Sequence, residues 1–150
     1  MKFKYLINEV LNQPLSYTWK YKSKEWWEGV FKIDKTKYNV TIGKYIESGD
    51  TEIWELTFNM SSSVHREVGN VTGTGHSFQV FATVKKMLLE FLKSKKGDDF
   101  ELRFSAKEPS RKKLYDKFAN MINKDTYLKF DKTRNREYAN LSAVYFFRSK

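Results

Sequence analysis

Residues 70–77 read NVTGTGHS and stand directly before a long segment of helical periodicity. Gly73 and Gly75 bracket one threonine, in a chain that has only seven glycines. A glycine turn that enters a helix presents unpaired backbone N–H groups and the positive end of the helix dipole, and no Cβ keeps a ligand away from the chain. These properties define a phosphate-binding loop. Because glycine is also the ordinary way to turn a chain into a helix, a purely structural turn is the competing interpretation.

Two common phosphate-binding motifs are absent from this loop. The position of the third glycine in the dinucleotide fingerprint holds Phe78, and no Gly-Lys-Ser/Thr follows, as a Walker loop requires.

The first half of the chain predicts a short helix followed by strands. Apolar residues at positions 6, 7, 10 and 11 have helical spacing and stop before Pro14. Aromatic and β-branched runs then predict an antiparallel meander over residues 16–22, 25–33 and 37–43, and the segment 51–60 alternates like a strand with one buried face.

The second half changes from strand periodicity to helical periodicity. Residues 80–92 form one broad apolar stripe, the strongest helix signal in the chain, and the alternating segment 100–106 predicts a strand that packs on this helix. Pro109 opens a second predicted helix, and two final strands are predicted at 127–131 and 141–147. The fold class is therefore α/β in the broad sense (α+β), with a mixed, mostly antiparallel sheet of about six to seven strands.

Composition narrows the class of protein. At 150 residues the chain is one domain by length, spanning 1–150, and without cysteine it has no disulfides, thiolate metal sites or cysteine nucleophiles. Two histidines alone make a metal enzyme an unfavoured interpretation, so no metal is expected. The amino terminus resembles neither a signal peptide nor a membrane span, which predicts a cytoplasmic protein with no membrane partner.

The net charge of +10 favours an anionic partner without naming it. Nucleic acid, an acidic protein and a phosphorylated cofactor all fit a basic surface, and such a charge is also an ordinary means of keeping a protein in solution.

The glycine loop resembles the pyrophosphate-binding loop of the Gcn5-related N-acetyltransferases (GNAT), which has the form Gln/Arg-x-x-Gly-x-Gly/Ala. Asn70 stands in its first place, and Gly73 and Gly75 in the glycine places. In that family the loop leaves a strand and starts the longest helix, and a strand, a second helix and two strands follow. The second helix here reads EPSRKKLYDKFAN and matches the family pattern at Leu114, Tyr115 and Lys117. The resemblance covers residues 52–148 and implies a GNAT-like fold.

The resemblance implies transfer of an acetyl group from acetyl-CoA to an amine. Acetyl-CoA is expected where the strand before the loop, residues 52–60, parts from the strand after the helix, residues 99–105. Tyr115 is then expected beside the thioester sulfur, where a phenol of ordinary pKa, about 10, can protonate the leaving thiolate. Glu55 is the first candidate to take the proton of the amine, with Glu52 and Glu67 behind it.

The resemblance also implies a set of cofactor-binding residues. The main chain of residues 52–60 is expected to pair with the pantetheine, and the backbone amides of 72–75 to hold the pyrophosphate. Arg111, with Lys112 and Lys113, fits a contact with the 3'-phosphate or with a nucleic acid, and it also fits a solvated face of the helix. His76 either caps the helix or touches a phosphate. The candidate set is Phe58, Met60, Asn70, Thr72, Gly73, Thr74, Gly75, His76 and Arg111.

Each candidate side chain also has an ordinary structural interpretation. Tyr115 on an amphipathic helix fits an aromatic residue at the edge of a core, and Glu55 between apolar neighbours fits a solvated side chain. The aromatic run around Trp26 and Trp27 could stack on nucleic-acid bases, but core packing is favoured.

Two features depart from the acetyltransferase pattern: the first 50 residues, and the end of the second helix, where Ala119 and Asn120 stand in place of the usual Gly-Phe. The first 50 residues predict one helix and a β-meander instead of the usual strand and two helices, so nothing identifies the acceptor. The chain also resembles short, lysine- and aromatic-rich proteins of tailed bacteriophages that share its loop, GTG-x-x-F-x-VF-x-TV, and its SR-x-KLY helix. An inactive binding module that acts on a host protein or a nucleic acid through a basic, aromatic surface is therefore the alternative to an enzyme.

Overall fold

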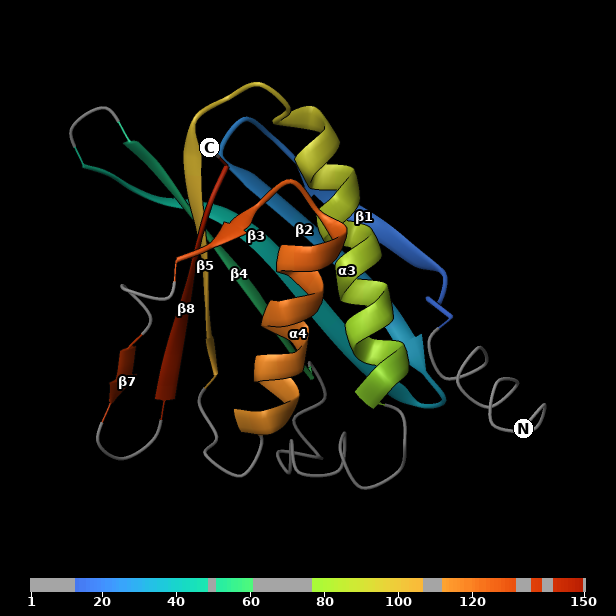
Figure 1. The fold of residues 1–150 in the computed structure, drawn as a ribbon. Coiled ribbons are helices and arrows are strands. Elements are labelled where there is room, and N and C mark those ends of the chain that lie inside the picture. Colours follow the sequence, from blue (N-terminus) through green and yellow to red (C-terminus); the bar gives the residue numbers. More distant parts are fainter. Residues whose placement is uncertain are drawn as a thin grey trace.

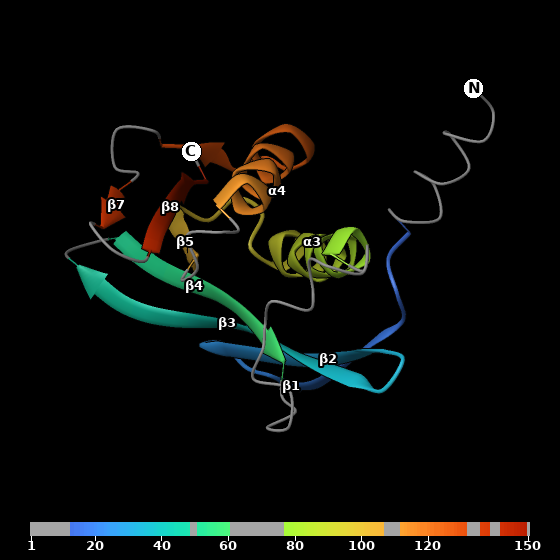
Figure 2. The ribbon, with the colours of Figure 1, turned by 90° about the horizontal axis from the view of Figure 1, so that it is seen from below.

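The computed structural model of the chain describes residues 13–48, 51–60, 77–106, 112–131, 136–138 and 142–149. Within these residues the chain forms one mixed sheet, and two helices lie against one of its faces (Figures 1 and 2). In chain order the elements are β1 (Tyr17–Lys22), β2 (Trp26–Ile33), β3 (Thr36–Ser48), β4 (Thr51–Met60), α3 (Ser77–Ser94), β5 (Phe100–Ala106), α4 (Lys112–Asp125), β6 (Lys129–Phe130), β7 (Arg136–Tyr138) and β8 (Ser142–Arg148). The opening helix predicted before Pro14 lies outside the described residues.

The sheet has the strand order β1-β2-β3-β4-β5-β8-β6, and β7 also pairs with β8. Every pairing is antiparallel except that of β4 with β5, the two strands that α3 connects. Strand β5 pairs with one edge of β8, and both β6 and β7 pair with its other edge. The eight strands therefore fill seven positions in the sheet. The predicted α+β class with a mixed, mostly antiparallel sheet is confirmed, and β7 is a strand that the sequence pattern did not predict.

Helix α3 owes its position to its apolar stripe. The predicted stripe is buried along its whole length except at Phe81, which packs against the core partly buried. Lys86 and Lys93 lie off the stripe and are exposed. Phe91 of α3 contacts side chains from two strands. Its ring centroid is 5.4 Å from that of Trp27 on β2 and 4.9 Å from that of Trp54 on β4. Burying a side chain of this size is worth about 1.5–3 kcal/mol, so the stripe fixes α3 across the sheet.

Helix α4 joins the same core through aromatic rings. Phe118 and Ile122 are fully buried, as the sequence pattern predicts. The ring centroid of Phe118 lies 5.0 Å from that of Phe81 on α3 and 5.3 Å from that of Phe104 on β5. Both helices and the sheet therefore meet in one aromatic cluster.

Strand β4 shows the alternation that the sequence predicts. Trp54 and Leu56 are buried toward the helices, on what we call the helix face of the sheet. Glu55 and Thr57 alternate with them and therefore lie on the opposite face, which we call the outer face. In the described part of the chain, no helix or strand covers the outer face (Figure 2).

Two glycines of the sheet lie on opposite faces, Gly29 on the helix face and Gly43 on the outer face. At Gly29 an added Cβ would lie 2.4 Å from Cε of Met87, a fully buried residue of α3, and 2.9 Å from the ring of Trp19. At Gly43 it would lie 2.4 Å from the ring of Trp26, which is exposed on the outer face.

We expect Gly29→Ala to lower the free energy of unfolding by about 1–3 kcal/mol, because the methyl group overpacks a closed core. Gly43→Ala should lower it by less, because the exposed indole of Trp26 can move aside. Urea denaturation of both variants measures the difference, and equal losses would contradict the assignment of the two faces.

Candidate functional site

The parallel strands β4 and β5 part before β4 ends. Their pairing runs from Glu52 opposite Phe100 to Leu56 opposite Phe104. Beyond that point β4 stays paired with β3 as far as Met60, whereas β5 stays paired with β8 as far as Ala106. The backbones of the two carboxyl ends therefore diverge (Figure 1), and we call this divergence of the main chain the opening.

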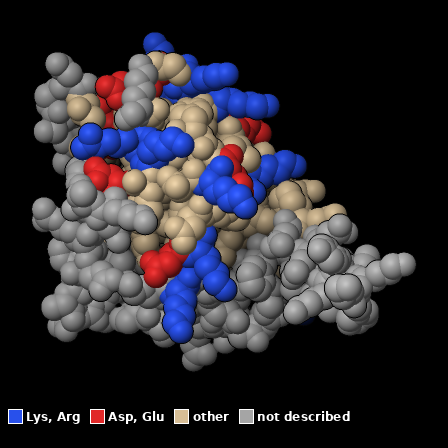
Figure 3. All heavy atoms as spheres, in the orientation of Figure 1, with Lys and Arg blue, Asp and Glu red and all other residues tan. Residues whose placement is uncertain are grey.

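The amino-terminal ends of both helices gather at this end of the sheet (Figure 1). The first N–H groups of a helix lack partners within the helix, and the helix dipole makes this end positive. Lys113 and Lys117 are exposed on the first half of α4, and Figure 3 shows Lys and Arg side chains over this part of the molecule. Ligands of sheets with parallel strands bind beyond the carboxyl ends of those strands, so this opening is the candidate site.

Tyr115 lies at the point where the strands part. Its ring centroid is 6.2 Å from that of Phe58 on β4, 6.3 Å from that of Phe104 on β5 and 5.9 Å from that of Phe81 on α3. The side chain is neither fully buried nor fully exposed. The structure therefore brings together two of the residues selected from the sequence, Tyr115 and Phe58, which are 57 positions apart in the chain.

Glu55 does not join them on the same face. It lies on the outer face, paired in register with Gly43 on one side and Arg103 on the other. It immediately precedes Leu56, the last residue of β4 that pairs with β5. Glu55 is thus at the level of the opening but on the opposite side of the sheet from Tyr115.

Glu52 has a structural role at the other end of β4. Its carboxylate accepts a 2.8 Å hydrogen bond from Nζ of Lys95, and Nζ of Lys44 lies 3.6 Å from its other oxygen. The hydrogen bond from Lys95 is the largest of the effects that hold the pKa of Glu52 below its ordinary value. A carboxylate held charged by two lysines, at the amino end of the strand, is not placed to act at the opening.

Most of the other candidates fall outside the described residues. These are Glu67, Asn70, Thr72, Gly73, Thr74, Gly75, His76 and Arg111. Met60 ends β4, and its side chain is likewise outside the described part. What the structure does describe is where this loop must connect, since β4 ends and α3 begins beside the opening (Figure 1).

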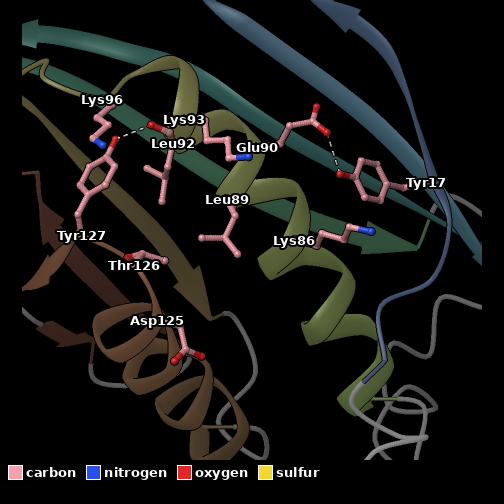
Figure 4. Close-up of a pocket in the computed structure, with 10 residues that line it drawn as sticks. All are labelled: Tyr17, Lys86, Leu89, Glu90, Leu92, Lys93, Lys96, Asp125, Thr126 and Tyr127. Carbon is pink, nitrogen blue, oxygen red and sulfur yellow. Dashed lines mark hydrogen bonds between the residues drawn. The ribbon is translucent and has the colours of Figure 1, made fainter.

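A hollow of about 530 Å³, which we call the α3 hollow, lies along the solvent side of α3 (Figure 4). Tyr17 of β1 and Tyr127, which follows α4, stand on either side of it, and Leu89 lies between them. Burial and a hydrogen bond to Glu90 raise the pKa of Tyr17 to about 12, and burial with the charge of Asp98 raises that of Tyr127 to about 12. Both phenols are neutral at ordinary pH, so neither of them is a general base in the hollow. Sequence reasoning missed this hollow because its walls come from segments far apart in the chain.

Comparison of the chain with protein-family models, with curated proteins and with solved structures gives no match. In the described part of the chain, no group of His, Cys, Asp or Glu side chains could hold a metal ion. No described helix has the length and apolar character needed to cross a membrane.

Glu90 of α3 connects this helix to β1 by hydrogen bonds, beside the α3 hollow. Its carboxylate accepts hydrogen bonds from Tyr17 Oη at 2.9 Å, from Trp19 Nε1 and from Lys22 Nζ at 3.1 Å. Burial alone would raise its pKa, but these three donors together hold the pKa of Glu90 below its ordinary value. A lowered pKa in the folded state means that the charged carboxylate stabilises the fold above its unfolded pKa, about 4.3, and that this contribution is lost as the pH falls through the folded value.

We expect Glu90→Gln to lower the free energy of unfolding at neutral pH by about 1 kcal/mol, at the low end for hydrogen bonds to a charged group because the side chain is 40% exposed. The difference from the native protein should shrink as the pH falls below about 4. Urea denaturation as a function of pH measures it, and Glu25→Gln, an exposed carboxylate of the β1–β2 turn, is the matched control. A difference that does not change with pH would show that the charge of Glu90 is not involved.

Proposed function

We propose that the chain binds acetyl-CoA in the opening between β4 and β5 and transfers its acetyl group to an amine. The observation that carries the proposal is the parting of the two strands after Leu56 and Phe104, with the ring of Tyr115 beside both. The order of the elements adds support, because α3 is followed by a strand, a second helix and then further strands, as the resemblance to the acetyltransferases implies.

The main chain of β4 supplies the first part of the binding site. Residues 57–60 pair with β3 on one edge, and β5 has already left the other edge. N–H and C=O groups on that edge are placed to bind an extended arm that carries amides, as a further strand would. Pantetheine is such an arm.

The ends of the helices supply the second part. The amino termini of α3 and α4 and the exposed Lys113 and Lys117 favour negative charge at this end of the sheet. The glycine loop that precedes α3 in the sequence would hold the pyrophosphate, as its resemblance implies. A phosphorylated ligand then lies along one side of the opening.

The two candidate catalytic groups act from opposite faces of the sheet. When bound, acetyl-CoA supplies an activated acetyl group with a thiolate as leaving group. The hydroxyl of Tyr115, on the helix face, donates a proton to that sulfur. The carboxylate of Glu55, on the outer face, accepts the proton of the amine, so the acceptor approaches from the outer face.

We expect acetyl-CoA to bind the native protein with micromolar affinity in a calorimetric titration. Tyr115→Phe should bind it with little change in affinity but lose acetyl transfer by about 10²–10⁴-fold, because only the proton donor is removed. Tyr127→Phe is the matched control, because it deletes a phenol hydroxyl at the other end of α4. That hydroxyl donates a 2.8 Å hydrogen bond to the carbonyl of Leu92. Gly75→Glu should abolish binding by adding charge and bulk to the loop.

One outcome would overturn the proposal, and another would remove Tyr115 from it. Absence of any heat with acetyl-CoA, at protein concentrations well above micromolar, would show that the opening is only a structural feature of the sheet. Binding with undiminished turnover in Tyr115→Phe would retain the site but remove Tyr115 from the chemistry.

A further inference from the structure

The outer face carries the exposed aromatic side chains of the described chain. Tyr21, Trp26 and Tyr45 are its exposed large hydrophobic residues, with exposed fractions of 55%, 43% and 57%. All three lie on the outer face, because Tyr21 pairs with Glu28, Trp26 with Gly43, and Tyr45 contacts Arg103. Large aromatic rings are usually buried, so three on one uncovered face call for an explanation.

The three rings form a regular diagonal across β1, β2 and β3. Tyr21 on β1 is opposite Glu28, and Trp26 lies two residues further along β2. Trp26 is opposite Gly43 on β3, and Tyr45 lies two residues further along that strand. Each step crosses one strand and advances two residues, which corresponds to a spacing of roughly 8 Å.

Two of these rings contact neighbouring residues of the sheet that fix their positions. The six-membered ring of Trp26 lies over Gly43, where a side chain would collide with it at 2.4 Å. The guanidinium of Arg103, on β5, lies 4.4 Å from the ring centroid of Tyr45. Both rings are therefore held in place while a large part of each remains open to solvent.

Basic residues lie at both ends of this diagonal and further along the same face. Lys20 precedes Tyr21 at one end, and Arg103 contacts Tyr45 at the other. Lys32 and Lys37 are paired in register on the outer face, and Lys32 lies four residues along β2 from Glu28, the residue opposite Tyr21. Lys20 is close enough to Lys37 to hydrogen-bond with its neutral amine and to repel its charged form, and both effects lower the pKa of Lys37. Like charges gathered in this way favour the approach of a polyanion.

We propose that the outer face binds single-stranded nucleic acid. Bases stack on Tyr21, Trp26 and Tyr45, and the lysines neutralise phosphates. Aromatic rings spaced along a sheet, with basic groups beside them, match the chemistry of such a strand, whose bases have free faces. A duplex keeps its bases stacked on one another, and an acidic protein would use the lysines but not the row of rings.

One carboxylate beside the diagonal fits this occupant. Glu28 lies opposite Tyr21 on the outer face. A carboxylate accepts hydrogen bonds from exocyclic amino groups such as N4 of cytosine. Glu28 would turn base edges toward the sheet and leave the phosphates to the basic side chains.

The fluorescence of Trp26 reports directly on the proposed contact. The chain has four tryptophans, and the other three, Trp19, Trp27 and Trp54, belong to the helix face. We expect oligodeoxycytidylate of about 12 nucleotides to quench tryptophan fluorescence on binding at low salt. In Trp26→Phe most of this quenching should disappear, while the anisotropy of a labelled oligonucleotide still reports binding.

Affinity measurements test the aromatic rings and the charges separately. Trp26→Ala and Tyr45→Ala should each weaken binding by about tenfold, the usual loss for one stacked base. Lys32→Gln should lower the slope of log affinity against log salt by about one unit. Lys93→Gln, which removes the same charge from the exposed side of α3, should leave that slope unchanged. Circular dichroism and urea denaturation show whether each variant remains folded.

Four results would overturn the inference. They are no binding of the oligonucleotide at low salt, quenching that persists in Trp26→Phe, equal effects of Lys32→Gln and Lys93→Gln, and a duplex of the same length bound as tightly as the single strand. If the protein sediments as a dimer that Trp26→Ala dissociates, the outer face is a contact between two copies instead. Acetyl-CoA binding plays no part in these measurements, so this inference and the proposed function fail or stand separately.

Discussion

Burial of the apolar stripe of α3 is the interaction on which the rest of the structure depends. The helix connects the two parallel strands, and its Phe91 contacts both Trp27 and Trp54. Removing such a ring from water contributes more than any single hydrogen bond at this surface. Since α3 must lie across the sheet to bury the stripe, β4 and β5 become neighbours, and the position at which they part is fixed. Core packing therefore determines where the candidate site lies.

The sequence predicts the parts of the fold that have a clear period. The stripe of α3 and the alternation in β4 are both long enough to be unambiguous, and the structure confirms them. The three residues of β7 are too few to show a period, so this strand could not be predicted. The α3 hollow could not be predicted either, because only the tertiary fold brings Tyr17 and Tyr127 to its two sides.

The candidate site is predictable only in part, for a related reason. A motif indicates which residues share an element, as Leu114 and Tyr115 do, but not which side of a sheet a side chain reaches. The alternation of side chains along a strand decides that question, and it places Glu55 on the face of the sheet opposite Tyr115. It also separates Trp26 from Trp27, since consecutive residues of a strand point to opposite faces. Core packing, the favoured interpretation of this pair, is correct for Trp27 and wrong for Trp26, whose ring is exposed.

Two β-bulges place the exposed aromatic rings, and they argue that the outer face is more than an unoccupied surface. Tyr17 and Trp19 face α3, and a regular strand would put Tyr21 beside them. Lys20 is an extra residue opposite β2, and it turns Tyr21 to the other face; Tyr45 is itself the extra residue of the second bulge, between Lys44 and Ile46. A bulge interrupts the pairing of a sheet and re-aims a side chain, and bulges gather beside functional sites. Without the first one, Tyr21 would lie on the helix face and the diagonal of rings would lack its first member.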